Sequence, residues 1–238
     1  MRALQRFGER LWLADGPSVS FFGFPYPTRM AVVRLADRSL WIWSPVELDD
    51  GLRREVQALG EPRYVVEPNK LHHLALAGWV QTWPALEVYA PPGLARKRSD
   101  VSFAAELTDD PPEAWRAEID QVLVGGSVVM TEVLFFHRPS RTCLVGDLIQ
   151  KHDPHSMKAW QRWVMKADGL AGPAGSTPRE WRLTFVDRAR ARAAVRRAFA
   201  WEPDNLVIAH GTCAFGDGAE VLRGSLSWLN AEGSDVVR

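Results

Sequence analysis

The chain has little cysteine, no excess of charge of either sign and no long apolar run. Its two cysteines, Cys143 and Cys213, lie far apart and outside any CxxC pair, which excludes a disulfide framework. The 29 basic and 29 acidic side chains balance, so neither nucleic acid nor an anionic membrane is expected as the main partner. The N-terminal stretch has no apolar signal core, and no run reaches membrane-spanning length. We therefore expect a cytoplasmic protein.

What the sequence does have is an ordinary globular composition. Hydrophobic residues make up 46% of the chain, and eleven of them are tryptophans, most of which we expect in the core. A chain of 238 residues can bury a large core, and only Gly169–Pro178 resembles a linker. We therefore expect a single domain over residues 1–238.

The patterning predicts two successive blocks of strands, each followed by helices. The predicted strands are Arg10–Asp15, Met30–Leu35, Ser39–Trp43, Tyr64–Val66, Val88–Ala90, Thr131–His137, Arg141–Val145 and Leu206–Ala209. The predicted helices are Glu47–Leu59, Leu71–Trp83, Met157–Ala167, Asp187–Phe199 and Ala219–Leu229. This order favours packed sheets with helices outside. A doubly wound parallel sheet is the competing fold, but three early strands with short connections argue against it, because parallel neighbours require crossovers.

Three short segments carry the side chains that can do chemistry. They are Val-Val-Glu-Pro-Asn-Lys-Leu-His-His at 65–73, Val-Gly-Asp at 145–147 and Ile-Ala-His-Gly at 208–211. In this order and spacing they resemble the metallo-β-lactamase fold, which places His-x-His-x-Asp-His after a buried strand, Gly-Asp at the end of another and His-Gly at the end of a late one. The chain is similar to a divergent branch of that superfamily (DUF4336-like), in which Pro-Asn-x-x-His-His replaces the usual motif. The Glu-Val-x-Phe-Phe-His-x-x-Ser-Arg-Thr phrase at 132–142 fits the same branch. The resemblance implies an αββα sandwich.

The departures from the usual motif decide which metal chemistry the resemblance permits. If the last histidine of the motif corresponds to His73, then Pro68 and Lys70 stand at the first two histidine positions. Proline has no ligand atom, and a protonated lysine has no lone pair. No histidine occurs from Leu74 to Phe136 to complete that site. The resemblance therefore implies that the first metal site is lost, and with it a two-metal mechanism.

The second metal site of the fold keeps a full set of candidate ligands. The set is His72, which stands at the aspartate position of the motif, together with His73, Asp147 and His210. Three imidazoles and a carboxylate suit one zinc or iron ion. Four bound ligands would make a structural site, whereas one free position would allow hydrolysis of an ester, amide or phosphoester. Adjacent histidines on a helix point about 100° apart, so both can bind only if they precede the regular helix.

A metal-free interpretation stands beside the hydrolase. In it, Lys70 replaces the lost metal charge and pairs with Asp147, and the two are the candidate catalytic residues if chemistry survives. Otherwise the cleft binds a small molecule or a protein partner and catalyses nothing. Asp147 alone can also be a helix N-cap, and His210 a strand-end residue. A homodimer through the loops around 21–24 is left open.

Other polar residues give weaker signals. Glu132 and His137 lie five apart on one strand and face opposite sides, so they do not both enter one cleft unless the strand bulges. His152 and His155 lie in a loop that is more often solvated than functional. The roles of these three histidines are left open. Cys213 follows His210 closely but has no base partner, so we do not expect it to be a nucleophile.

Overall fold

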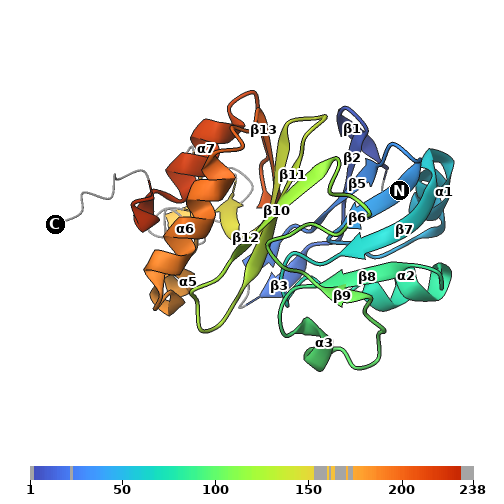
Figure 1. The fold of residues 1–238 in the computed structure, drawn as a ribbon, viewed down its shortest axis with the longest axis horizontal. Coiled ribbons are helices and arrows are strands. Elements are labelled where there is room, and N and C mark those ends of the chain that lie inside the picture. Colours follow the sequence, from blue (N-terminus) through green and yellow to red (C-terminus); the bar gives the residue numbers. More distant parts are fainter. Residues whose placement is uncertain are drawn as a thin grey trace.

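The computed structural model describes residues 3–21, 24–152, 160, 162–163, 170 and 174–231. Two β-sheets pack face to face, and helices cover both outer faces (Figure 1). This is the αββα sandwich that the resemblance implied. The antiparallel strands at the start of the chain exclude the doubly wound parallel sheet.

Within the described residues, the larger sheet has seven strands in the order β1-β2-β5-β6-β7-β8-β9. Their bounds are Gln5–Gly8, Leu11–Asp15, Arg29–Arg34, Ser39–Trp43, Glu61–Val66, Glu87–Ala90 and Ala105–Glu106. The first four pair antiparallel, and β6 to β9 pair parallel through crossovers. The small hairpin of β3 (Val19–Phe21) and β4 (Phe24–Tyr26) lies between β2 and β5 in the chain.

The second sheet has the strand order β10-β11-β12-β13-β14 among the described residues. Its strands are Ile119–Val124, Glu132–His137, Thr142–Lys151, Asn205–Gly211 and Ala214–Phe215. The predicted hairpin at residues 131–145 is confirmed as the antiparallel pair β11 and β12. Strand β12 then pairs parallel with β13, and their register shifts between Val145 and Gln150.

Helices α1 (Asp50–Leu59) and α2 (Leu76–Thr82) cover the larger sheet, and α6 (Arg188–Phe199) and α7 (Gly218–Ser225) cover the smaller one (Figure 1). The short elements are α3 (Leu94–Lys97), α5 (Arg179–Thr184) and the 3₁₀ turn η2 (Ser227–Leu229). The helix predicted at Met157–Ala167 lies almost entirely outside the described residues. No helix in the part of the chain that the structure describes is long and apolar enough to cross a membrane.

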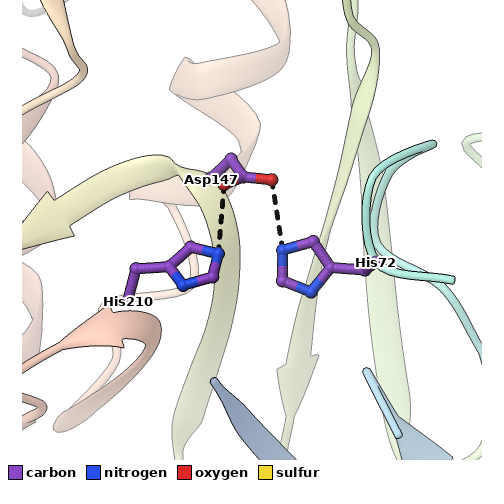
Figure 2. A group of neighbouring side chains, drawn as sticks. All are labelled: His72, Asp147 and His210. Atoms are coloured by element: carbon purple, nitrogen blue, oxygen red, sulfur yellow. Dashed lines mark ion pairs between the residues drawn. The ribbon is translucent and has the colours of Figure 1, made fainter. Parts of the chain in front are cut away.

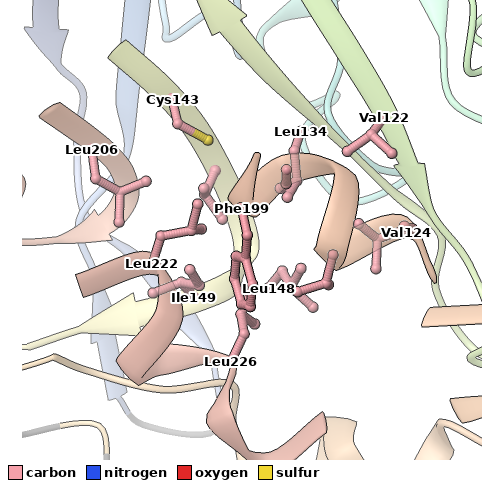
Figure 3. Close-up of a cluster of buried hydrophobic side chains, with 14 of the residues drawn as sticks. Val122, Val124, Leu134, Cys143, Leu148, Ile149, Phe199, Leu206, Leu222 and Leu226 are labelled. Atoms are coloured by element: carbon pink, nitrogen blue, oxygen red, sulfur yellow. The ribbon is translucent and has the colours of Figure 1, made fainter. Parts of the chain in front are cut away.

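Three apolar cores separate the four layers. The core between the sheets is built on aromatic rings, among them Trp41, whose ring centroid lies 5.2 Å from that of Phe135. One outer core packs α1 and α2 on the larger sheet, and Leu52 and Val56 are fully buried there. The other packs α6 and α7 on the smaller sheet (Figure 3). The candidate site lies at one end of the sandwich, beyond these apolar cores.

Candidate metal centre

Three of the predicted ligands come together where the two sheets meet. His72, Asp147 and His210 each offer one ligand atom, and these atoms lie within 4.8 Å of one another (Figure 2). Asp147 is 6% exposed and His210 is 7% exposed, so the cluster is almost closed to bulk water. Segments far apart in the sequence therefore build one buried polar site.

Each ligand sits where regular structure is interrupted or ends. His72 lies in the loop after β7, before α2 begins at Leu76. Asp147 lies within β12, at the shift in register with β13. It is therefore not a helix N-cap. His210 is the penultimate residue of β13.

Asp147 lies between the two imidazoles. Its Oδ2 is 3.1 Å from Nε2 of His72, and its Oδ1 is 3.1 Å from Nε2 of His210. Two ligands that each lie ~2.0–2.1 Å from a tetrahedral zinc ion are ~3.3 Å apart. The observed separations fit an ion pair, and they also fit ligands arranged around one metal ion.

The outer nitrogens of both imidazoles have hydrogen-bond partners. Nδ1 of His210 lies 2.7 Å from the carbonyl oxygen of Pro27, which can only accept, so Nδ1 carries the proton. In the neutral ring, Nε2 then presents a lone pair towards Asp147. Nδ1 of His72 lies 2.6 Å from Oγ of Ser44, while its Nε2 is buried and has no hydrogen-bond partner among the described residues. Both inner nitrogens are thus oriented as metal ligands are.

The cluster is strongly coupled by charge. Burial alone would raise the pKa of Asp147, but the positive charges of His72 and His210 hold this pKa well below its usual range. Burial opposes protonation of His210, but Asp147 outweighs it and raises the pKa of that imidazole. Asp147 is therefore an anion that attracts a positive partner, which can be a proton on His210 or a metal ion.

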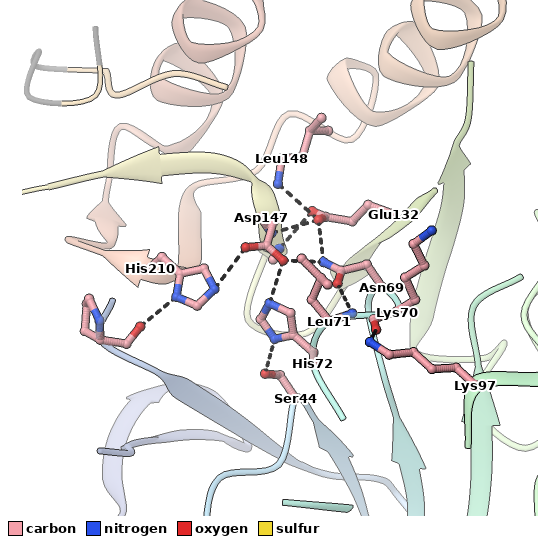
Figure 4. Close-up of polar contacts among 12 residues, drawn as sticks. Ser44, Asn69, Lys70, Leu71, His72, Lys97, Glu132, Asp147, Leu148 and His210 are labelled. Atoms are coloured by element: carbon pink, nitrogen blue, oxygen red, sulfur yellow. Dashed lines mark hydrogen bonds and ion pairs between the residues drawn. The ribbon is translucent and has the colours of Figure 1, made fainter. Parts of the chain in front are cut away.

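Two further residues complete the site, and the sequence did not assign them to it (Figure 4). Nδ2 of Asn69 donates to Oδ2 of Asp147 at 2.8 Å and to Oε2 of Glu132 at 2.9 Å. Glu132 accepts from the backbone N–H groups of Gly146, Asp147 and Leu148 at 2.7–3.0 Å. Burial, with the charge of Asp147, raises the pKa of Glu132 to about 8. A glutamate at the start of a buried strand, followed by four apolar residues, was the available signal.

The structure does not bring His73 into the ligand group. Its Nδ1 lies 3.1 Å from Nη1 of Arg98, which also donates to the His73 carbonyl at 2.6 Å. Both histidines do precede the regular helix, but their side chains diverge, and Arg98 holds the second one. The expected four-residue set is therefore corrected to three.

Lys70 does not pair with Asp147. Its side chain extends away from the carboxylate (Figure 4), and the ion pairs of Asp147 among the described residues are those with the two histidines. Asn69 instead fills the place beside Oδ2. The backbone carbonyl of Lys70 accepts from Nζ of Lys97 at 3.1 Å, so this residue contributes to the loop through its main chain.

The remaining candidates lie outside the ligand group. His137 is fully buried against Oγ of Ser140 and does not enter the site that Glu132 joins, in agreement with the prediction that the two do not share one cleft. His152 is buried rather than solvated, and its ring packs on Tyr26, which packs on His210. His155 lies outside the described residues. Burial raises the pKa of Cys213, as in an unreactive thiol.

Comparison with solved structures shows the same fold. A metallo-β-lactamase from Pontibacter korlensis matches with a TM-score of 0.66 at 12% identity, over 97% of this chain and 99% of that chain. The metallo-β-lactamase FIM-1 from Pseudomonas aeruginosa in its mono-zinc form matches with a TM-score of 0.62 at 14% identity, over 97% and 93%. The metal-soaked Flv1 flavodiiron core from Synechocystis sp. PCC6803 matches with a TM-score of 0.66 at 12% identity, over 96% and 61%.

The chain thus has the metallo-β-lactamase fold and carries a candidate metal-ligand group. The family model described as "Domain of unknown function (DUF4336)" matches residues 12–162, which is more than half of the sequence. The chain therefore belongs to this family. No curated protein matches it.

Proposed function

We propose that the protein is a hydrolase that uses a single zinc or iron ion bound by His72, Asp147 and His210. The observation that carries the proposal is the convergence of three buried ligand atoms within 4.8 Å. Nε2 of His72 lies 3.1 Å from Oδ2 of Asp147 in an ion pair, but this contact lacks the geometry of a hydrogen bond. A metal ion bound among the three atoms would give this nitrogen a directed bond.

The ligand chemistry fits such an ion. Two imidazoles and one carboxylate make a set of nitrogen and oxygen donors that suits zinc or iron. Three protein ligands leave a fourth position open, as in catalytic rather than structural zinc sites. An ion bound there would act as a Lewis acid and lower the pKa of a bound water towards ~7, which suits hydrolysis of an ester, amide or phosphoester.

The chain's own residues hold the ligands in place. Pro27 and Ser44 fix the outer nitrogens of the two imidazoles, which sets the orientation of the rings. Trp43 and Tyr26 pack near His72 and His210 and restrict their movement. The mono-zinc form of FIM-1 adds support, because a protein of this fold holds one zinc ion.

A second, metal-free function is favoured by one specific observation. Asp147 is already paired with two imidazoles and with Asn69, so a proton on His210 balances its charge without a metal. In that case the cleft would bind a small molecule or a protein partner and would not catalyse hydrolysis. His210, and not Lys70, would then supply the positive charge.

Metal analysis separates the two functions. Protein purified without a histidine tag would be analysed for zinc and iron, alongside a His72→Ala/His210→Ala double variant and a His73→Ala control. About one ion per chain in the wild type and in the control, and none in the double variant, supports the metal-dependent hydrolase. Wild-type protein that contains no ion and takes up no added Zn²⁺ contradicts it and supports the metal-free function.

A further inference from the structure

The amide of Asn69 has a fixed orientation and presents a donor to Asp147. Its Oδ1 accepts from the backbone N–H of Leu71 at 2.8 Å, so its Nδ2 must face the two carboxylates of Asp147 and Glu132 (Figure 4). Asn69 is fully buried. A flipped amide would place oxygen against oxygen at both carboxylates and would leave the Leu71 N–H facing an NH₂ group. The donor at Oδ2 of Asp147 is therefore a built feature of the site.

Glu132 fixes the backbone on which Asp147 stands. Where β12 departs from its register with β13, three consecutive N–H groups at 146–148 turn to the Glu132 carboxylate instead of the neighbouring strand. A Cβ atom at Gly146 would lie 3.1 Å from both Nδ2 of Asn69 and Oε2 of Glu132. A side chain immediately before the ligand would thus crowd both groups, which favours glycine at this position.

These contacts also determine what can approach Asp147. On one side of the carboxylate, His72 lies at Oδ2 and His210 lies at Oδ1. The NH₂ group of Asn69 approaches Oδ2 from another direction. An N–H donor repels a cation and supplies no lone pair. A second metal ion therefore cannot bind to Oδ2 from the Asn69 side unless the amide moves away.

We propose that Asn69 and Glu132 are positioning residues that hold Asp147 as the ligand of one metal ion and close the Asn69 side of its carboxylate to a second. This inference rests on the proposed metal-dependent function and deepens it, because it names the groups that orient Asp147 and keep a second ion from the Asn69 side of its carboxylate. The Asn69 amide takes the place that the sequence alone assigned to Lys70.

Metal titration of three variants tests the assignment. Asn69→Ala removes the donor, and Asn69→Asp keeps the size of the side chain but replaces the donor with a carboxylate oxygen. The matched control is Asn205→Ala, which removes another buried asparagine whose amide bonds are made to Ser140 and Gly216, away from the cluster. Zn²⁺ affinity and stoichiometry are measured by calorimetry, and the coordination geometry is followed through the visible spectrum of bound Co²⁺.

We expect one ion per wild-type chain, and an affinity roughly 10- to 100-fold lower with a changed Co²⁺ spectrum in Asn69→Ala, as is usual when an outer partner of a metal ligand is lost. Asn69→Asp should bind a second ion, because three carboxylates then converge. Asn205→Ala should lose stability while keeping its metal affinity and Co²⁺ spectrum.

Each alternative outcome has a separate meaning. One ion in the wild type, with affinity and spectrum unchanged in Asn69→Ala, overturns the positioning role and leaves the proposed function standing. Two ions bound per wild-type chain would contradict the claim that Asn69 closes one side of the Asp147 carboxylate to a second ion. A wild-type chain that binds no ion contradicts the proposed function itself, and the inference falls with it. Asn69→Ala decides the positioning role even if Asn69→Asp does not fold.

Discussion

At the scale of single residues, Gly146 shows how little space the candidate site leaves. An added Cβ would meet Asn69 and Glu132 at 3.1 Å and Cγ of Pro68 at 3.2 Å. Pro68, Asn69 and Glu132 are all buried. Glu132 accepts from the backbone N–H of Gly146, and Asn69 donates to the carboxylate of Asp147. Packing therefore favours glycine here, and a left-handed backbone conformation does not.

Gly146→Ala should destabilise the protein and weaken metal binding together. Overpacking of a close contact usually costs about 1–3 kcal/mol in the free energy of unfolding. Because the added methyl group pushes on Asn69 and Glu132, we expect metal affinity to fall as well. Urea unfolding measures the first effect, and calorimetric titration with Zn²⁺ measures the second.

Gly78→Ala is the matched control for this substitution. Gly78 is exposed in α2, and a Cβ there would meet nothing within 4 Å. Alanine in a helix interior is favoured over glycine by roughly 0.5–1 kcal/mol, so this variant should be more stable and should bind metal normally. A Gly146→Ala protein as stable as Gly78→Ala would show that the site can relax around the methyl group.

Residue patterns in the sequence predicted part of the site and missed the rest. The Gly-Asp and His-Gly segments pointed to Asp147 and His210 because they resemble the motifs that end two strands in the metallo-β-lactamase fold. Two adjacent histidines in a loop have no periodicity, so no local pattern could distinguish His72 from His73 as the ligand. The choice depends on Arg98, which directly follows α3 and holds His73. Asn69 was missed for a similar reason, since its partners lie 63 and 78 positions away.

At the scale of elements, periodicity predicted the helices well where a helix rests on a sheet. The helix predicted at Glu47–Leu59 is observed as α1 at Asp50–Leu59, and its Leu52 and Val56 are fully buried against the larger sheet. The predicted helix at Leu71–Trp83 begins only at Leu76. Asn69, Lys97 and Arg98 bind the backbone of residues 70–73 and hold it as a loop. Long-range contacts of this kind cannot be inferred from the local periodicity of the sequence.

Capping of α1 gives a prediction at this scale. Oδ1 of Asp49 accepts from the N–H of Leu52 at 2.8 Å, so it satisfies one free donor at the helix start. Asp49→Ala should lower the free energy of unfolding by about 1 kcal/mol, as measured by urea denaturation.

Asp217 supplies the comparison, because it precedes α7 in the N-cap position but makes no side-chain capping bond. Asp217→Ala should change stability by only a few tenths of a kcal/mol, through weaker attraction to the helix dipole. Equal losses in the two variants would mean that the Asp49 hydrogen bond contributes no more than a charge near a helix end.

At the scale of the whole molecule, the order of elements carried most of the information about the fold. Two blocks of strands followed by helices have few compact arrangements, and a sandwich with outer helices buries both faces of both sheets. The same arrangement explains why a site forms here. The loop after β7, the irregular part of β12 and the end of β13 all reach one edge of the sandwich. The sequence could not place the sheets relative to each other, so the neighbours of the ligands remained unknown.

The buried histidines make the stability of the whole fold sensitive to acid. Burial, with the charge of Arg10, lowers the pKa of His137 from 6.5 to about 4. His152 shifts in the same direction, to about 4, because of burial and the charge of His210. The folded state thus favours neutral imidazole rings, while the same histidines in the unfolded chain take up protons near their ordinary pKa of ~6.5. The contribution of each ring is fully present above pH ~6.5 and is lost as the pH falls towards ~4.

His137→Gln should therefore flatten the acid side of the stability profile. The shift of His137 corresponds to at most about 3 kcal/mol between pH ~6.5 and ~4. The variant should be less stable than the wild type at pH 8, because glutamine packs less well beside Ser140, yet it should lose less stability on acidification. Urea unfolding at pH 8, 6, 5 and 4 measures both curves. Parallel curves for the two proteins would place the acid sensitivity elsewhere, with His152 and the paired carboxylates as the remaining sources.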